Sequence, residues 1–521
     1  MKKEVATKGL NKATVAIVGG IAPVTLAVIW AGTVTLSLYW LGLPVLLLLA
    51  LAGAAVALQS RKLGFAAAGL AALLVLAIFA GSSVFQSERY RAQLGATAEG
   101  ANALPALDLK KSGLVTPSAA RKAAETLLST DPGLGSQVEV GQLVKQLVAG
   151  EMVYVGLLEH KGFGRWLANK STPGYAVVSA HDASKARLVL GRNIQLLDSG
   201  WMGNSIERQV WLKNPTLKVV DFTPELDDAG TPFWVVSVLD REQAFGPTQV
   251  EGVVLVNAET GEQQHYPLAK VPTWVDRAIP EFILVNQVNY WGALVHGFWN
   301  TIFGAKDILH AGATDLVYGQ DGKAQWFVEL TAAGKKSGIN GFLMVDARTK
   351  QATHYTLAGA DQESAIHAME GLYPEKNFSM GNALPFMVGD TPTYVAPMYK
   401  GGVLRAFGLV SIKDYQIVAG GETLDAAVRA YMARLHRISG NADQANVSSS
   451  IKGVVERFAA DVRQGATTYL LQLKGSKQIY VGASDVSQSL PLTKVGDTVD
   501  LTAEGSSGAL VMTKFINQAL D

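Results

Sequence analysis

The chain of 521 residues contains no cysteine, and this absence excludes a first set of chemistries. Without thiols there can be no disulfide, no cysteine nucleophile and no thiolate metal site. An excess of either charge is also lacking, because 45 basic side chains accompany 44 acidic ones and leave a net charge of +1. We therefore do not expect nucleic acid as a partner, since surfaces that bind phosphates carry an excess of positive charge. Stability must come from packed cores or from association between chains.

Motifs for catalysis and cofactor binding are missing as well. The sequence has no GxxxxGK[ST] phosphate loop, no HExxH zinc motif and no GxSxG nucleophile elbow. No histidine lies four residues from another, which is a common spacing of metal ligands on a helix. We therefore assign no catalytic, cofactor-binding or metal-binding residue and predict that the protein is not an enzyme. An active site assembled from dispersed residues is the alternative, because catalytic triads are defined by geometry.

Charge is absent from two long stretches near the N-terminus. Residues 13–60 and residues 63–87 contain no charged side chain, and Arg61-Lys62 separates them. A spanning helix needs about 20 apolar residues, so the first stretch is long enough for two crossings and the second for one. The sequence predicts a membrane domain, residues 1–87, with three transmembrane helices. A cleaved signal peptide is the competing interpretation, but its apolar core has only about 7 to 15 residues.

Basic residues predict the orientation of this membrane domain. Four lysines lie within the first twelve residues, and Arg61-Lys62 follows the second predicted span. With three spans both clusters lie in the cytoplasm, as the positive-inside rule requires. The N-terminus is then cytoplasmic and everything after residue 88 is extracytoplasmic. This predicts a multi-pass protein of the bacterial inner membrane with a periplasmic body.

Changes in composition divide the rest of the chain. Residues 88–113 combine glycine, proline and alanine and are predicted to be a connector, and residues 437–450 contain a serine run typical of a linker. Between them lies the predicted extracytoplasmic body, residues 114–436. A small terminal domain, residues 451–521, follows the linker.

One phrase recurs in the body, namely a polar turn that leads into a strand with an aromatic residue. It ends in Trp234, in Trp326 and in Tyr394, and a looser version ends in Tyr154. A second strand follows about 15 to 25 residues later, within the range of a long hairpin connection. We predict repeated modules of one helix and one antiparallel sheet, with Trp234, Trp326 and Tyr394 in equivalent core positions.

Signals for the start of a helix separate the strand groups. Thr116-Pro117 offers an N-cap residue followed by proline at the first helical position. Asp361 and Thr423 are N-cap candidates before two further apolar-periodic segments. Each predicted helix thus lies between two groups of strands, as the modular organisation requires.

The second strands show a family resemblance. Residues 252–261 and 341–350 share the pattern Gly-x-hydrophobic-x-Val-Asn/Asp-Ala-x-Thr, where x is any residue. This pattern resembles the PepSY-like modules of bacterial envelope proteins, and the resemblance is best over residues 222–268 and 316–357. It implies one helix packed on a small antiparallel sheet, and a role in binding, inhibition or assembly without catalysis.

The terminal domain has a different pattern, with five short strand candidates. Its turn Val495-Gly496-Asp497 resembles the turn that enters a late strand in OB-fold barrels, which bind oligonucleotides, sugars or proteins. The expected fold class is therefore α+β, with three N-terminal transmembrane helices, repeated PepSY-like modules and a small C-terminal OB-like β-barrel.

Two segments are candidate contact surfaces. Residues 282–305 contain no Asp, Glu, Lys or Arg. This segment fits a core helix, an oligomer or membrane-surface contact, or a fourth span, although its buried amides would make a span costly. Its predicted interface residues are Trp291, His296, Phe298 and Trp299.

The second candidate surface is a basic and aromatic loop, residues 159–170. Trp together with Lys or Arg is typical of interfaces with lipid headgroups, and an anionic glycan offers similar chemistry. The predicted contact residues are Lys161, Arg165, Trp166 and Lys170. A long solvated hairpin loop is the competing interpretation.

These observations predict a membrane-anchored, extracytoplasmic structural or assembly protein of the bacterial envelope. Its expected partners are membrane lipid, further copies of the same chain, and cell-wall or envelope proteins, with no cofactor. Glycines in the apolar stretches, such as Gly19-Gly20, would allow close helix approach. The alternative is a membrane-tethered regulator or inhibitor, or an enzyme with a dispersed active site, that acts on envelope proteins or the cell wall.

Overall fold

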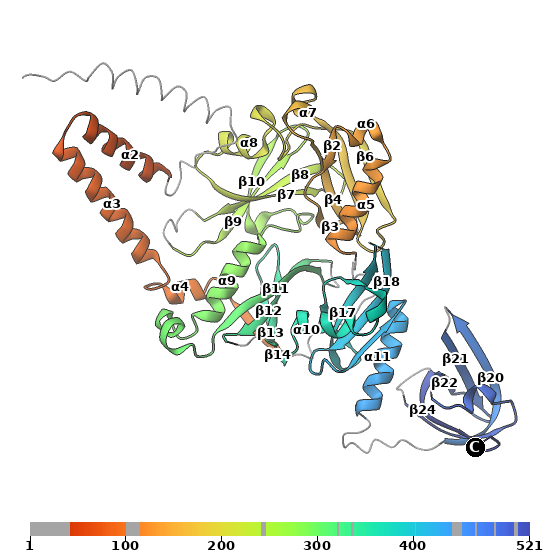
Figure 1. Cartoon of the computed structure of the whole chain (residues 1–521). Coiled ribbons are helices and arrows are strands. Elements are labelled where there is room, and N and C mark those ends of the chain that lie inside the picture. The colour runs from red at the N-terminus through yellow and green to blue at the C-terminus, as the bar shows by residue number, and fades with distance from the viewer. Residues whose placement is uncertain are drawn as a thin grey trace, which may run out of the picture. The chain divides into compact units, whose positions relative to one another are not determined.

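The computed structural model forms two compact units, Met1–Tyr431 and Met432–Asp521, whose elements are drawn in Figure 1. The residues that it describes are 42–100, 115–240, 246–319, 322–334, 338–401, 403–439, 451–463, 466–483, 486–504 and 509–520. Part of the predicted connector and most of the predicted linker lie outside these ranges.

The N-terminal region corrects the predicted fold class. Among the described residues, one helix, α3 (Arg61–Gly81), is long and apolar enough to cross a membrane. The preceding helix α2 (Gly42–Ala57) has 16 residues, fewer than the roughly 20 that a crossing needs. The prediction of three transmembrane helices is therefore wrong, and its first span falls largely in residues 1–41, outside the described part of the chain. The described structure is also mostly β, with 41% strand and 29% helix, rather than balanced α+β.

The first unit contains four antiparallel meanders, each with a helix before its first strand. In the first module these elements are α5 (Pro117–Ser129), β3 (Val144–Val148), β4 (Glu151–His160), β5 (Thr172–Ser179) and β6 (Ala186–Ile194). In the second they are α8 (Ile206–Lys213), β7 (Lys218–Leu226), β8 (Pro232–Leu239), β9 (Val250–Asn257) and β10 (Gln263–Pro267).

The third and fourth modules have the same strand order. The third consists of α9 (Glu281–Ala293), β11 (Leu309–Tyr318), β12 (Ala324–Ala332), β13 (Ile339–Asp346) and β14 (Ala352–Gly359). The fourth consists of α10 (Gln362–Glu370), β16 (Leu384–Val388), β17 (Thr391–Lys400), β18 (Val403–Ser411) and β19 (Val418–Gly421). In Figure 1 the first two modules occupy the upper part of this unit and the last two the lower part.

Short elements extend these modules. The first and fourth modules each gain a strand that pairs with the long second strand, whereas the third gains a parallel edge strand. These three strands are β2 (Val138–Val140), β15 (Ser379–Met380) and β1 (Ala96–Gly100). The remaining α-helices of the described residues are α4 (Ser87–Arg91), α6 (Pro132–Gly135), α7 (Phe163–Ala168) and α11 (Leu424–Ser439).

The aromatic residues of the recurring phrase occupy equivalent positions, as predicted. Tyr154, Trp234, Trp326 and Tyr394 each pair with a valine on the third strand of their meander, and all four are buried. Each belongs to a core cluster that also contains buried residues of its own module's helix. The turn-plus-aromatic phrase therefore marks the strand whose aromatic side chain packs under the helix.

In the first three modules the aromatic side chain also hydrogen-bonds to a backbone carbonyl of the segment that precedes the module's helix. The Tyr154 hydroxyl donates to the Val115 carbonyl at 2.7 Å, just before α5. Trp234 Nε1 donates to the Leu196 carbonyl at 2.8 Å, upstream of α8. In the third module Trp326 Nε1 donates to the carbonyl of the residue before Pro280, at 3.0 Å. In the fourth module the Tyr394 hydroxyl instead donates to the Glu329 carboxylate of the third module at 2.5 Å, which joins the two modules.

The glycine that opens each second-strand phrase is explained by close strand approach. A Cβ added to Gly174, Gly252 or Gly341 would lie 1.8, 2.2 or 2.3 Å from a carbonyl oxygen of the next strand. No side chain larger than hydrogen fits at such distances without displacing that strand. The three residues stand four positions before the valine that pairs with the aromatic residue, so one packing constraint recurs in three modules.

The second unit contains a closed five-stranded barrel of order β20-β21-β22-β24-β23. Its strands are β20 (Ile451–Arg463), β21 (Ala466–Leu473), β22 (Ile479–Ala483), β23 (Thr498–Glu504) and β24 (Ala509–Asn517). β22 and β24 pair in parallel and the other neighbours are antiparallel. The predicted small terminal barrel is confirmed, and its assignment to the OB folds stays a prediction.

Candidate functional site

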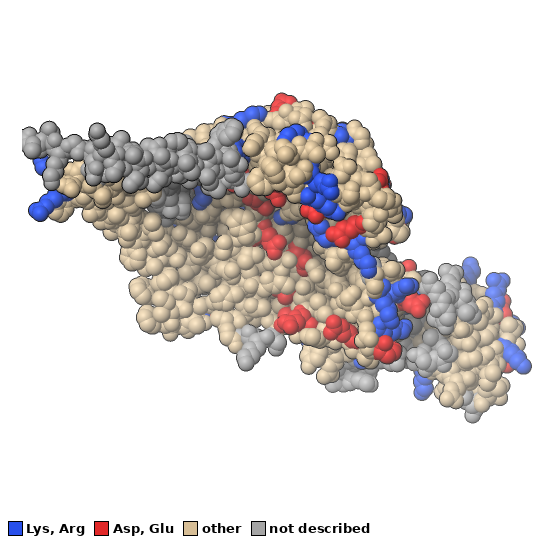
Figure 2. All heavy atoms as spheres, turned by 45° about the horizontal axis from the view of Figure 1, so that its top comes forward, with Lys and Arg blue, Asp and Glu red and all other residues tan. Residues whose placement is uncertain are grey.

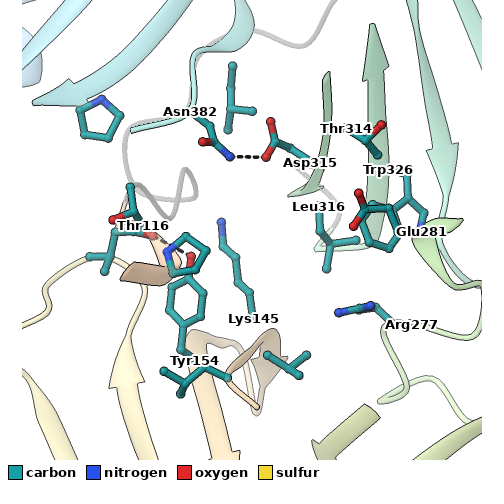
Figure 3. Close-up of a pocket in the computed structure, with 16 residues that line it drawn as sticks. Thr116, Lys145, Tyr154, Arg277, Glu281, Thr314, Asp315, Leu316, Trp326 and Asn382 are labelled. Carbon is teal, nitrogen blue, oxygen red and sulfur yellow. Dashed lines mark hydrogen bonds between the residues drawn. The ribbon is translucent and has the colours of Figure 1, made fainter. Parts of the chain in front are cut away.

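A cleft of about 200 Å³ is lined by residues of three modules and contains charged side chains (Figure 3). Its walls come from β3, β4, β11, β12 and β17, and from the first residues of α5, α9 and β16 with the segments that precede them. The polar side chains that line it are Thr116, Lys145, Tyr154, Arg277, Glu281, Thr314, Asp315 and Asn382. Apolar residues complete the lining, and Glu281 and Asn382 are exposed, so the cleft is open to solvent and contains charges of both signs.

Lys145 extends from β3 into the middle of the cleft (Figure 3). Burial disfavours its charged form and lowers the pKa of Lys145 to about 8, although the carboxylate of Asp315 favours the charge. The Lys145 ammonium can therefore lose its proton much closer to neutral pH than a surface lysine can. Such a shift in a cleft is typical of functional groups, and it also occurs in structural ion networks.

Asp315 faces the cleft from the third module. Its carboxylate accepts a hydrogen bond from Gln362 Nε2 at 3.0 Å and another from the Asn382 amide. Burial raises the pKa of Asp315, and these two hydrogen bonds and Lys145 partly offset the increase. Gln362 also donates to the Ala383 carbonyl at 2.9 Å, so the amide that holds Asp315 is itself fixed.

Arg277 and Glu281 form a second pair of opposite charges in the cleft (Figure 3). The Arg277 guanidinium lies 5.2 Å from the centre of the Trp326 ring, and its Nη2 lies 3.8 Å from the Asp221 carboxylate. Burial raises the pKa of Glu281, while the Arg277 cation opposes this shift. The cleft thus contains two cationic and two acidic side chains.

A buried acidic network supports the wall behind Lys145. Glu225 on β7 accepts hydrogen bonds from the backbone N–H groups of Asp276 at 2.9 Å and Arg277 at 3.1 Å. Asp276 in turn accepts from the Leu147 N–H at 2.7 Å and from the Tyr318 hydroxyl at 2.9 Å. Burial raises the pKa of both carboxyls, and the negative charge of Asp276 raises that of Glu225 further. The network fastens β3, β7 and β11 to one another.

This arrangement suits binding of a small polar molecule. Pockets that combine apolar walls with a few convergent polar groups are the usual ligand sites of proteins. Lys145 and Arg277 can hold an anionic group, and Asp315 and Glu281 can hold a cationic group or hydrogen-bond donors. In the described part of the chain there is no group of three or more His, Asp or Glu side chains that could hold a metal ion.

The predicted interface residues of segment 282–305 are separated by the structure. Trp291, on α9, is half-buried and its ring contacts His354 edge to face at 5.2 Å. Phe298 is half-buried, whereas His296 and Trp299 are exposed beyond the end of α9. The first part of the segment is therefore packed helix, and the exposed apolar part lies at its end.

The predicted basic and aromatic loop is also divided. Trp166 on α7 is buried, and the Lys170 ammonium lies 3.3 Å from the centre of its ring. Lys161 donates to a backbone carbonyl of α6 at 2.6 Å. Arg165 lines a separate cavity of about 300 Å³ together with His160 and other polar residues. No ligand contact of these residues is tested by the structure, so the headgroup or glycan contact stays a prediction.

Comparisons with known proteins give no family. No family model matches the chain, and no curated protein matches it. Among solved structures, a match covers 71% of this chain and 96% of an endo-1,4-β-xylanase from Bacteroides thetaiotaomicron, at 8% identity and a TM-score of 0.14. A TM-score this low carries no argument about fold or activity.

The sequence did not indicate the charged residues of the cleft, but one signal could have identified Lys145. It pairs with the aromatic Tyr154, and the residues that pair with the equivalent aromatic residues are Pro224, Leu316 and Pro385. An alignment of the modules extended to their first strands would show a lysine where the other modules have apolar residues. Asp315 gives no comparable signal, because a single Asp in a strand is usually solvated.

Proposed function

We propose that this protein is a membrane-anchored structural and assembly protein of a bacterial envelope that acts by binding and self-association. The observation that carries the proposal is the exposed apolar surface of α3. Of its residues only Ala67 and Gly81 are buried, while large apolar side chains such as Phe65, Leu73 and Val75 are exposed. A helix that is apolar all round and mostly exposed is typical of a membrane span.

The dimensions and charges of α3 agree with a span. Its 21 residues extend about 31 Å at about 1.5 Å per residue, close to the roughly 30 Å hydrocarbon core. Arg61 and Lys62 begin the helix, and the positive-inside rule favours this end in the cytoplasm. Apart from a few basic side chains at its far left, Figure 2 shows a broad surface without charged side chains on the left of the unit, and charged side chains gathered in a band across the body. The modules would then lie outside the cytoplasm.

Self-association is supported by the sheet edges. The edge strands β6 and β10 are mostly exposed or half-exposed and end their sheets. Unpaired edges can accept a strand from another chain. The resemblance to PepSY-like and OB-fold modules, which are binding modules, supports the same proposal.

Fractionation of the full-length chain tests the anchor. After expression in bacteria, the protein should stay in the membrane pellet on washing with alkaline carbonate. Protease added outside spheroplasts should then digest the modules. Release by carbonate would refute the anchor, and protection of the modules until lysis would refute the orientation.

The cleft favours a second candidate function, a tethered regulator that responds to a small ligand. The specific observation is the desolvated Lys145 opposite Asp315 between modules. Mass spectrometry of small molecules that copurify with the protein tests this role. We expect a polar compound that is lost in Lys145→Met and retained in Lys270→Met, an exposed control. Identical extracts from both variants would argue against it.

A further inference from the structure

An exposed apolar tip follows α9. A helical segment that includes the π-helical turn Asn300–Gly304 presents Trp299, Ile302 and Phe303, which are 60%, 55% and 80% exposed. The rings of Trp299 and Phe303 stack at 5.9 Å with an interplanar angle of 16°. Three large apolar side chains at one turn are costly in water unless something covers them.

Polar groups close the base of this turn. Asn300 holds Lys306 at both backbone groups: its Oδ1 accepts from the Lys306 N–H at 3.1 Å, and its Nδ2 donates to the Lys306 carbonyl at 2.9 Å. His296 Nε2 lies 2.9 Å from the Asp307 carboxylate. We call His296, Lys306 and Asp307 the polar collar of the apolar tip. Hydrogen bonds in this collar fix the shape of the turn at its base.

The same region is joined to the end of α3. The Tyr90 hydroxyl on α4 donates to the Gly81 carbonyl, the last residue of α3, at 3.0 Å. The Tyr90 ring contacts the Tyr290 ring on α9 edge to face at 4.7 Å. Gly297 lies against Ser87 on α4, since a Cβ at Gly297 would be 3.7 Å from the serine oxygen. The tip thus directly follows α9 and Gly297, which pack against α4 at the C-terminal end of α3.

We propose that the tip Trp299–Phe303 inserts into the lipid bilayer, in the leaflet where α3 ends. This inference rests on the proposed membrane anchor. The Trp299 ring would lie at headgroup depth, where Trp is enriched, and Ile302 and Phe303 would contact the acyl chains just below the headgroups. The collar would stay among headgroups and water, where Lys306 can contact anionic lipid.

A bilayer suits this surface better than a second copy of the chain. Stable interfaces between proteins use about 20 to 30 residues on each side, whereas the tip offers three large apolar side chains. A membrane needs no complementary surface, and the anchor already holds the chain beside it. The insertion would fix the tilt of the modules relative to the membrane by adding a second point of attachment.

The absence of cysteine allows a direct test in the full-length protein. Single variants Phe303→Cys, Val75→Cys and Leu212→Cys are labelled with an environment-sensitive fluorophore and reconstituted into vesicles of phosphatidylcholine and phosphatidylglycerol. Val75 lies in α3, and Leu212 is an exposed residue of α8 that serves as the matched control. All three positions are exposed, so labelling does not require unfolding.

We expect the Phe303 label to show blue-shifted emission and to be quenched by lipids with a nitroxide near the headgroup. The Val75 label should be quenched by nitroxides deeper in the bilayer, and the Leu212 label by neither. An unquenched Phe303 label beside a quenched Val75 label would overturn the insertion and leave the anchor standing. If neither is quenched, the anchor itself is refuted. If the emission of the Phe303 label is blue-shifted but is not quenched by nitroxide lipids, protein covers the tip, and this result would also overturn the inference.

Discussion

Replacing Trp326 by alanine tests whether the repeated aromatic position holds each module together. The Trp326 side chain is 3% exposed and packs in the core between β12 and α9. Its Nε1 donates to the Ile279 carbonyl at 3.0 Å, which fixes the chain that enters α9. The substitution therefore removes a large apolar volume and the tie between sheet and helix at once.

The expected loss follows from these contacts. Truncation of a buried tryptophan to alanine costs about 3 to 5 kcal/mol. Trp326→Phe keeps most of the packing and leaves the Ile279 carbonyl without its donor, so we expect a smaller loss of about 1 to 2 kcal/mol. Trp299→Ala is the matched control, because the same side chain is 60% exposed there and surface changes stay within about 0.5 kcal/mol.

Urea unfolding in mild detergent, followed by circular dichroism, measures the three losses. Circular dichroism avoids the change in fluorescence that removal of a tryptophan causes. The urea midpoint should be highest for Trp299→Ala, lower for Trp326→Phe and lowest for Trp326→Ala. The dependence of the unfolding free energy on urea concentration should stay unchanged if unfolding stays cooperative. A loss below about 1 kcal/mol for Trp326→Ala would show that the equivalence of the aromatic positions has no energetic meaning.

Three further predictions concern pH, close packing and assembly. Burial raises the pKa of Glu329 from 4.5 to about 7, so the folded state is stabilised when this carboxyl is neutral. This stabilisation is lost as the pH rises from about 4.5 through 7, by up to about 3 kcal/mol. Glu329→Gln should flatten the pH dependence of the urea midpoint, and an unchanged profile would contradict this. Gly252→Ala should cost about 1 to 3 kcal/mol because its Cβ would lie 2.2 Å from the Tyr266 oxygen, whereas Gly164→Ala, with no atom within 4 Å, should change little; equal effects on the midpoint would rule out the close-approach argument. Light scattering in several mild detergents should give a mass above the 55.3 kDa of one chain, and a monomer in all of them at micromolar concentration would refute self-association.

Local chemistry made several parts of the fold predictable. Thr116 and Asp361 accept hydrogen bonds from the third residue after them, as expected of N-caps, and Thr423 does the same for Ala426. Asn257 and Asp346 accept from the two turns that follow their strands. Such contacts span only a few residues, so residue type and order are enough to indicate them.

The membrane region was less predictable for a physical reason. The charge-free stretch 13–60 has the length of two spans, but hydropathy does not show where a helix ends. In the structure α2 ends at Ala57, and Gln59 adopts a left-handed backbone with φ of 49° in the turn before α3. A count of spans taken from stretch length alone therefore gave too many helices.

The cleft depends on contacts that no local pattern encodes. The Tyr318 hydroxyl oxygen lies 2.9 Å from the Lys145 carbonyl oxygen, across 173 residues of sequence. Asp315 likewise belongs to the third module, whereas its amide partners Gln362 and Asn382 belong to the fourth. A lysine or aspartate in a strand normally indicates a solvated face, and only the packing of whole modules reverses that interpretation.

The position of these charges explains why they can be buried at all. Lys145, Glu225 and Asp315 lie on the first strands of three modules, and the structure brings these strands to the cleft and its wall. A buried charge is costly alone, and its cost falls when opposite charges and hydrogen bonds accompany it. Because each partner comes from another module, the compensation is complete only in the assembled unit. The charges therefore favour one arrangement of the modules, so neutralising a single member, as in Lys145→Met, should weaken the contacts between modules.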